Sequence, residues 1–298
     1  MTDYSKECPA CGARVPEKSR WCPRCGRDLL AGPGLSTEVG NPNVPAGAVG
    51  AKERLVEAIR ARVQTDEVLS IVWIFLPIIA SVAAVIGIVI GILFLILGWW
   101  VGAAIAVWTG VIVALVLAAV LFALLNYKLI DRQNQHMTRE EVLRGALMEY
   151  IRKHSQERNL AQLLSSQIAT MESIQYDAKS RERETSATLF AILIVIPVVG
   201  LIFLLYVLYV LTEFPYHHDR RWHAYTQQAQ SAASHLGMTV ILPSWKTLPD
   251  RSFIIYLVLT LLTAGLFLIY WYYVLIKDLN NHFGAQWQFE DQIASQMK

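Results

Sequence analysis

The chain has 298 residues, of which 54% are hydrophobic and only 17% are charged. Soluble domains carry about 25% charged residues, so this balance indicates a membrane protein. The 26 basic and 24 acidic residues leave a net charge of only +2, which favours neither a polyanion-binding protein nor an acidic one. We expect no enzyme, because the sequence contains no nucleophile elbow, phosphate-binding glycine loop or HExxH motif.

All four cysteines lie near the N-terminus, in two copies of Cys-Pro-x-Cys-Gly: Cys8, Cys11, Cys22 and Cys25. Two residues between thiolates let one tight turn direct both sulfurs to a single ion. Four thiolates suit tetrahedral zinc and leave no open position for a catalytic water, so we predict a structural zinc site. A redox dithiol pair is the alternative, but it does not explain two matched knuckles.

These motifs define a ribbon over residues 1–30, which closely resembles the short zinc-ribbon domain at the ends of many bacterial and archaeal proteins. The resemblance implies zinc binding but not what the ribbon contacts. Basic residues around Trp21 would suit nucleic acid, anionic lipid or an acidic partner, whereas a solvated basic face is the simpler interpretation. Nucleic acid is therefore not the partner that we expect.

Residues 31–50 are rich in Gly, Pro, Ser and Asn without apolar periodicity, which predicts a flexible linker. Residues 51–67 carry apolar side chains at helical spacing: Leu55, Val56, Ile59 and Val63. Because charged residues lie between them, this pattern predicts an amphipathic helix that leads into the membrane.

Two uncharged apolar segments, 71–97 and 101–125, are each long enough to cross a bilayer core of about 30 Å. Only Gly98, Trp99 and Trp100 separate them, so residues 71–125 predict a transmembrane hairpin. No basic residue lies at its tip, whereas Lys and Arg are frequent on both flanks. The positive-inside rule then predicts a multi-pass protein of the cell membrane with a cytoplasmic N-terminus.

Residues 126–186 predict a long cytoplasmic helix, because Gly145 is the only Gly or Pro between residues 138 and 184. An apolar stripe follows a 3.5-residue repeat along it: Leu143, Leu147, Tyr150, His154, Ala161, Leu164, Ile168 and Met171. Such a stripe needs a packing partner. The partner is either a second copy, which would make a homo-oligomer, or other parts of the same chain.

The remaining chain comprises a third apolar segment, a connecting helix and loop, a fourth apolar segment and a C-terminal amphipathic helix: 187–212, 213–252, 253–276 and 277–298. We expect both apolar segments to be straight spans, because straight helices satisfy their backbone groups internally. The alternative is two re-entrant hairpins that break near Pro197 and Gly265. Together these elements predict an all-α integral membrane protein with a small N-terminal zinc ribbon.

The later segments belong to an internal repeat of an apolar segment followed by a polar helix. A shift of 65 residues pairs His217 with His282. A shift of 146 residues pairs His136 with the same histidine. This larger shift also pairs Asn134 with Asn280.

The last copy carries a pattern of eight residues: Thr263, Gly265, Tyr270, Trp271, Tyr273, Lys277, Asn280 and His282. The pattern resembles a prokaryotic membrane domain family of unknown function. That resemblance implies a membrane location and no particular activity, and the earlier copies lack the Tyr-Trp pair.

His217, His218 and His223 cluster in sequence beside Asp219, so they are candidates for metal binding. Solvated histidines at a membrane interface are the simpler interpretation, and it is the one that we favour. The function that we expect is a membrane-embedded scaffold or adaptor, held by the lipid bilayer, that recruits a cytoplasmic protein partner through its ribbon and self-associates into a homo-oligomer. An oligomeric channel or transporter and a membrane-tethered nucleic-acid-binding regulator are the alternatives.

Overall fold

A computed structural model describes five stretches of the chain: residues 4–7, 14–16, 50–98, 101–242 and 247–297. Strands β1 (Tyr4–Glu7) and β2 (Arg14–Pro16) pair antiparallel. In sequence they flank the first Cys-Pro-Ala-Cys-Gly motif. The four cysteines lie outside the described residues, so the zinc ribbon stays a prediction.

Everything else with regular structure in these stretches is helical. The helices are α1 (Ala51–Arg60), α2 (Arg62–Thr65), α3 (Val72–Ile96), α4 (Val101–Glu157), α5 (Ser165–Arg181), α6 (Ala187–Ile194), α7 (Val199–His235), α8 (Phe253–Leu262) and α9 (Phe267–Gln296). Three of them, α3, α4 and α7, are long and apolar enough to cross a membrane. The expected all-α membrane class is confirmed at this level.

The long helices continue across the boundaries between apolar and polar sequence that hydropathy suggests. Helix α4 continues from its apolar half into its polar half without interruption at residue 125, and α7 and α9 do the same at residues 212 and 276. A change from apolar to polar side chains alters the environment of a helix but not its backbone hydrogen bonds. The predicted long helix therefore begins inside the apolar hairpin, and it ends at Glu157 before α5 starts.

The expectation of straight spans at 187–212 and 253–276 is wrong, because each segment is a short helical hairpin. Between α6 and α7 the chain reverses at Val198, whose φ is 67°. Between α8 and α9 it reverses at Gly265, whose φ is 93°. At Gly200 an added Cβ would lie only 2.2 Å from the carbonyl oxygen of Ile194, so the tight approach of α6 and α7 requires glycine.

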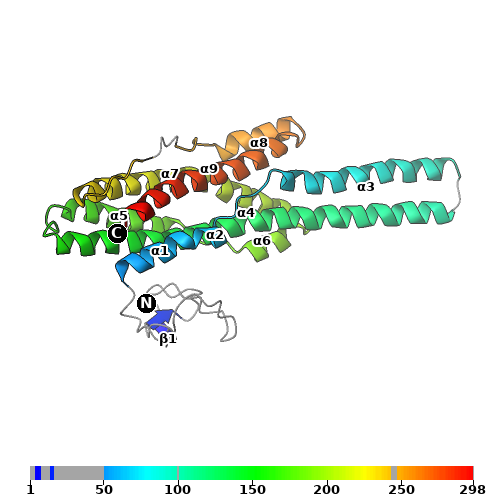
Figure 1. Ribbon diagram of the computed structural model, residues 1–298. Coiled ribbons are helices and arrows are strands. Elements are labelled where there is room, and N and C mark those ends of the chain that lie inside the picture. The colour runs from blue at the N-terminus through cyan, green and yellow to red at the C-terminus, as the bar shows by residue number, and fades with distance from the viewer. Residues whose placement is uncertain (1–3, 8–13, 17–49, 99–100, 243–246, 298) are drawn as a thin grey trace.

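Three helical hairpins, α3–α4, α6–α7 and α8–α9, thus contain the apolar segments of the chain (Figure 1). Their second helices, α4, α7 and α9, contact one another in all three combinations and carry the polar continuations toward the same end of the molecule. Equivalent interior positions are buried in each, for example Leu125, Val207 and Trp271. The three positions differ by 82 and 64 residues, so the repeat relates α7 to α9 by a shift of 64 rather than 65.

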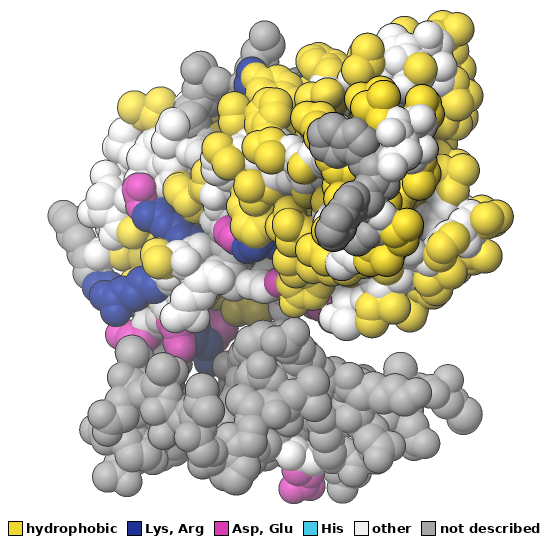
Figure 2. Space-filling view, turned by 90° about the vertical axis from the view of Figure 1, so that its right-hand side faces the viewer, with side chains coloured by type: hydrophobic (Ala, Val, Ile, Leu, Met, Phe, Trp, Pro, Cys, Tyr) yellow, Lys and Arg dark blue, Asp and Glu magenta, His cyan; other side chains and the backbone are white. Residues whose placement is uncertain are grey.

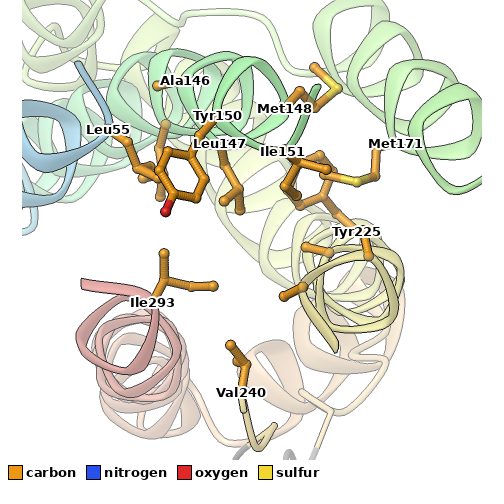
Figure 3. Close-up of a cluster of buried hydrophobic side chains, with 14 of the residues drawn as sticks. Leu55, Ala146, Leu147, Met148, Tyr150, Ile151, Met171, Tyr225, Val240 and Ile293 are labelled. Atoms are coloured by element: carbon orange, nitrogen blue, oxygen red, sulfur yellow. The ribbon is translucent and has the colours of Figure 1, made fainter. Parts of the chain in front are cut away.

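Two hydrophobic cores follow from this arrangement. One lies in the polar half of the bundle and joins α1, α4, α5, α7 and α9 through side chains such as Leu55, Leu147, Met171, Tyr225 and Ile293 (Figure 3). The apolar stripe that begins at residue 143 contributes to this core, so its packing partner lies within the chain. The second core lies between the bases of the three hairpins.

The hairpin end of the molecule presents a hydrophobic surface. Figure 2 looks onto that end, where apolar side chains cover most of the described surface while charged ones gather at one side. The exposed side chains of α3 and of the apolar half of α4, up to residue 125, are almost entirely aliphatic, as in Ile96 and Val101, which are 74% and 76% exposed. Lipid is the solvent that suits such a surface.

Candidate metal centre

One histidine from each long helix reaches the axis of the bundle, just below the bases of the hairpins. His136 comes from α4, His218 from α7 and His282 from α9, and none is more than 1% exposed. Their positions differ by the same 82 and 64 residues as the other interior positions. Glu140, one turn after His136 on the same face of α4, is fully buried beside them.

The four side chains direct one ligand atom each toward a common point. The Nε2 atoms of His136 and His218 are 3.1 Å apart. The Glu140 Oε2 atom lies 3.4 Å from the first of these nitrogens and 3.0 Å from the second. It lies 3.9 Å from the Nε2 atom of His282. All four ligand atoms lie within 4.8 Å of one another.

These separations are comparable to, and in part wider than, the edges of a coordination tetrahedron. With zinc bonds of about 2.0 to 2.1 Å to nitrogen and oxygen, tetrahedral geometry places neighbouring ligand atoms about 3.3 to 3.4 Å apart. Four of the six separations run from 3.0 to 3.9 Å, and all six are within 4.8 Å. The group could therefore hold a metal ion with small adjustments of the side chains.

Each histidine also has a carboxylate beside its Nδ1 atom, on the side of the ring that faces away from the centre. The Nδ1 atom of His136 lies 3.0 Å from Asp66, that of His218 lies 2.8 Å from Glu182, and that of His282 lies 2.8 Å from Asp219. A carboxylate acceptor places the ring proton on Nδ1 and turns the lone pair of Nε2 toward the centre. Such pairing is the usual outer shell of histidine metal ligands.

Two of the outer carboxylates, Asp66 and Glu182, stay ionised. Burial alone would raise the pKa of Asp66, but the adjacent His136 and Arg139 outweigh it and hold the pKa well below its usual range. Burial likewise opposes ionisation of Glu182, yet the neighbouring His218 lowers its pKa to about 2. Anionic acceptors at the Nδ1 atoms strengthen the histidines as ligands for a cation.

Close to the centre, side-chain hydrogen bonds connect the polar segments that precede the hairpins to the helices of the bundle. The side-chain amide of Asn134 accepts from Thr185 N at 3.2 Å and donates to the carbonyl of the same residue at 2.6 Å. Asn280 forms the matching pair of bonds with Leu69.

In the remaining repeat, which contains α7, the corresponding hydrogen bond involves Asp219. This residue accepts from Leu248 N at 3.0 Å while its other oxygen faces His282. Each repeat thus bonds to the segment just before a neighbouring hairpin. Helix α4 bonds to the segment before α6, α7 to the segment before α8, and α9 to the segment before α3. These three contacts link the repeats in a closed ring. The ring fixes the positions of the three histidines along the bundle axis.

The three repeats carry different residue types one helical turn after the histidines. The positions four residues after them hold Glu140, Trp222 and Gln286, and all three are buried. Glu140 points back to the centre, and an ion pair with Arg144 compensates its charge. The arrangement therefore supplies three imidazoles and one carboxylate.

The structure separates the histidines that cluster in sequence. His217 lies on the outer face of α7 with its side chain 56% exposed, and His223 lies beside Gln227 on the same helix. Only His218 reaches the interior, so the interpretation of solvated interfacial histidines is wrong for it. The pairing of His217 with His282 is wrong by one residue.

A signal for the site was available in the sequence. The 146-residue shift correctly relates His136 to His282, and the pattern His-x3-Glu adds a carboxylate at helical spacing. The cysteine ligands predicted in the N-terminal ribbon, by contrast, lie outside the described residues. Comparison with protein-family models, with curated proteins and with solved structures gives no match, so the candidate centre rests on its own geometry.

Proposed function

We propose that the chain is a metal-stabilised membrane scaffold, in which one transition-metal ion joins the three helical hairpins where they leave the bilayer. The observation that carries this proposal is the convergence of three Nε2 atoms and one carboxylate oxygen on a single buried point. Because the ligands come from α4, α7 and α9, an ion bound there stabilises the contact among all three repeats.

Zinc is the metal that the donor set favours. Imidazole ligands suit zinc, copper, iron and nickel, whereas calcium and magnesium prefer shells made of oxygen. Three nitrogens and one oxygen at tetrahedral spacing match zinc best. The predicted zinc ribbon would give the protein a second zinc ion of different chemistry, bound by four thiolates.

A structural role follows from the closed ligand shell. A catalytic zinc ion keeps one position open for water or substrate, whereas four protein ligands fill a tetrahedral shell. The four side chains of this group are at most 1% exposed. We therefore maintain that the protein is not an enzyme, and we propose that its scaffold holds the N-terminal arm at the membrane to recruit a cytoplasmic partner.

The proposal includes the topology of the hairpins and the side of the membrane on which the polar body lies. The polar ends of α4, α7 and α9 point the same way, which supports re-entrant hairpins rather than four spans. The basic flanks of the long hairpin support a cytoplasmic location for that polar body. Self-association loses its main support, because the apolar stripe is buried within one chain.

Metal analysis of purified protein tests the proposal. Changing Cys8, Cys11, Cys22 and Cys25 to Ser removes the ribbon ligands, and we expect this variant to retain about one zinc ion per chain. Adding His218→Ala should abolish binding, whereas adding His217→Ala should leave it unchanged. These neighbouring histidines are a matched pair, one facing the centre and one facing out. Metal content near zero in the four-serine variant would refute the proposal.

A further inference from the structure

The two short hairpins end well before the long one does. Helices α6 and α8 have 8 and 10 residues, which at about 1.5 Å per residue span about 12 and 15 Å. Helix α3 has 25 residues and spans about 37 Å. A bilayer core is about 30 Å thick, so α6 and α8 are too short to cross it, and α3–α4 is the hairpin in which both helices are long enough to pass through it. Figure 1 shows its tip far beyond the other two.

All three hairpins share a common base. Lys128 of α4 lies over the ring of Trp73 at 5.2 Å, and Lys277 of α9 lies over Tyr273 at 5.3 Å. Phe253, at the start of α8, meets Tyr209 of α7 with ring centroids 5.6 Å apart. Aromatic rings and lysines at one level mark a membrane surface. The bilayer surface therefore passes through the bases of the hairpins.

The tips of the short hairpins carry the chemistry of a lipid interior. Val198, Leu262 and Leu266 are 89%, 78% and 72% exposed. No charged residue and no tryptophan lies at either tip, whereas Trp99 and Trp100 separate α3 from α4 in the sequence. Tryptophan prefers the interface, so this difference places the long tip at the far surface and the short tips within hydrocarbon.

Most backbone N–H groups of the two turns bond within the turn itself, which lowers the cost of placing them in lipid. At the first tip Gly200 N donates to the Ile196 carbonyl at 2.8 Å. At the second, Gly265 N donates to the Thr260 carbonyl at 2.8 Å, and the hydroxyl of Thr263 accepts from Phe267 N at 2.9 Å. These bonds reduce the number of backbone groups that neighbouring helices must cover when the chain reverses inside the bilayer.

We propose that the two short hairpins form a wedge in the leaflet next to the polar body, and that the protein prefers a bilayer that is convex on that side. Helices α6 to α9 add a cross-section on the order of 300 Å² to one leaflet, taking a helix diameter of about 10 Å. The far leaflet accommodates only α3 and α4. Expanding one leaflet relative to the other favours curvature toward the expanded side.

Reconstitution of the full-length protein tests the wedge. The four cysteines are changed to Ser, Ser231→Cys marks the polar body, and the protein is inserted into phosphatidylcholine and phosphatidylglycerol vesicles of small and large diameter. An impermeant thiol reagent then counts molecules whose polar body faces outward. We expect that fraction to rise at least two-fold in the small vesicles. An equal fraction at both diameters would overturn the proposal.

A depth measurement and a second variant complete the test. A fluorophore on Leu262→Cys should be quenched most strongly by lipids labelled near the bilayer centre, and strongest quenching by headgroup-labelled lipids would also overturn the proposal. Val198→Asp with Leu262→Asp should expel the tips and remove the preference for small vesicles. Zinc content, measured on the same variant, reports whether the bundle is intact, so the wedge can fail while the metal centre stands.

Discussion

At the scale of single residues, the centre depends on which side of a helix a histidine occupies. His217 and His218 are neighbours, but successive residues on an α-helix point about 100° apart. One faces outward and the other reaches the axis with a 0% exposed side chain. The internal repeat identified the correct region of α7, but a one-residue error in its register moves the paired histidine from the interior to the surface.

The outer carboxylates were beyond sequence reasoning for a different reason. Asp66, Glu182 and Asp219 come from three segments far apart in the chain, and they reach the histidines only after the hairpins assemble. Nothing in their local sequence distinguishes them from the other acidic residues. Their role follows from the closed ring of contacts between repeats.

We predict that Asp219→Asn weakens zinc binding without removing the site. The amide has one acceptor oxygen, so it can accept from the Nδ1–H group of His282 or from Leu248 N but not from both, and it loses the negative charge that makes the ring a stronger ligand. Loss of such an outer partner lowers metal affinity by about 10- to 100-fold. Competition with a zinc chelator, in the four-serine background, measures this change. Asp250→Asn, at an exposed position, is the control, and equal affinity of both variants would contradict the role assigned to Asp219.

At the scale of elements, hydropathy located the apolar segments but not their shape. Residues 71–125 form a long helical hairpin as expected, because two uncharged segments with a three-residue connection leave no other compact arrangement. The segments at 187–212 and 253–276 have similar composition and fold as short hairpins instead. Their reversals depend on single residues such as Gly200 and Gly265, whose effect on a straight helix is ambiguous in sequence.

Gly200→Ala should destabilise the α6–α7 hairpin. An added Cβ would lie 2.2 Å from the Ile194 carbonyl oxygen, a distance that forces the two helices apart. Gly284→Ala in α9 is the matched control, because no atom lies within 4 Å of the added Cβ there. Since alanine favours helix by about 1 kcal/mol over glycine, the control should be neutral or stabilising. Thermal unfolding in detergent compares them, and a melting temperature for Gly200→Ala as high as the control's would refute the tight turn.

Single cysteines decide the topology. In the four-serine background, Ser231→Cys lies near the end of α7, Ser295→Cys near the end of α9 and Val101→Cys at the tip of the long hairpin. We predict that an impermeant thiol reagent treats positions 231 and 295 alike in intact cells, and position 101 oppositely. Opposite labelling of 231 and 295 would contradict the two re-entrant hairpins and show that the chain crosses the membrane between these positions.

At the scale of the whole molecule, composition and charge segregation predicted an all-α membrane protein, and three helices are long and apolar enough to cross a bilayer. The repeat predicted duplicated architecture. It did not predict that three copies surround one axis, because that arrangement depends on contacts between segments distant in the chain. The metal centre lies on this axis, so its assignment required the folded structure.

The central claim is that His136, Glu140, His218 and His282 bind one metal ion together. X-ray absorption at the zinc edge, on the variant with Cys8, Cys11, Cys22 and Cys25 changed to Ser, tests it most directly. The predicted spectrum has about four nitrogen and oxygen neighbours at about 2.0 to 2.1 Å. Its outer shells should show the multiple scattering of three imidazole rings. A spectrum without imidazole scattering, or a protein that binds no zinc, would contradict the account.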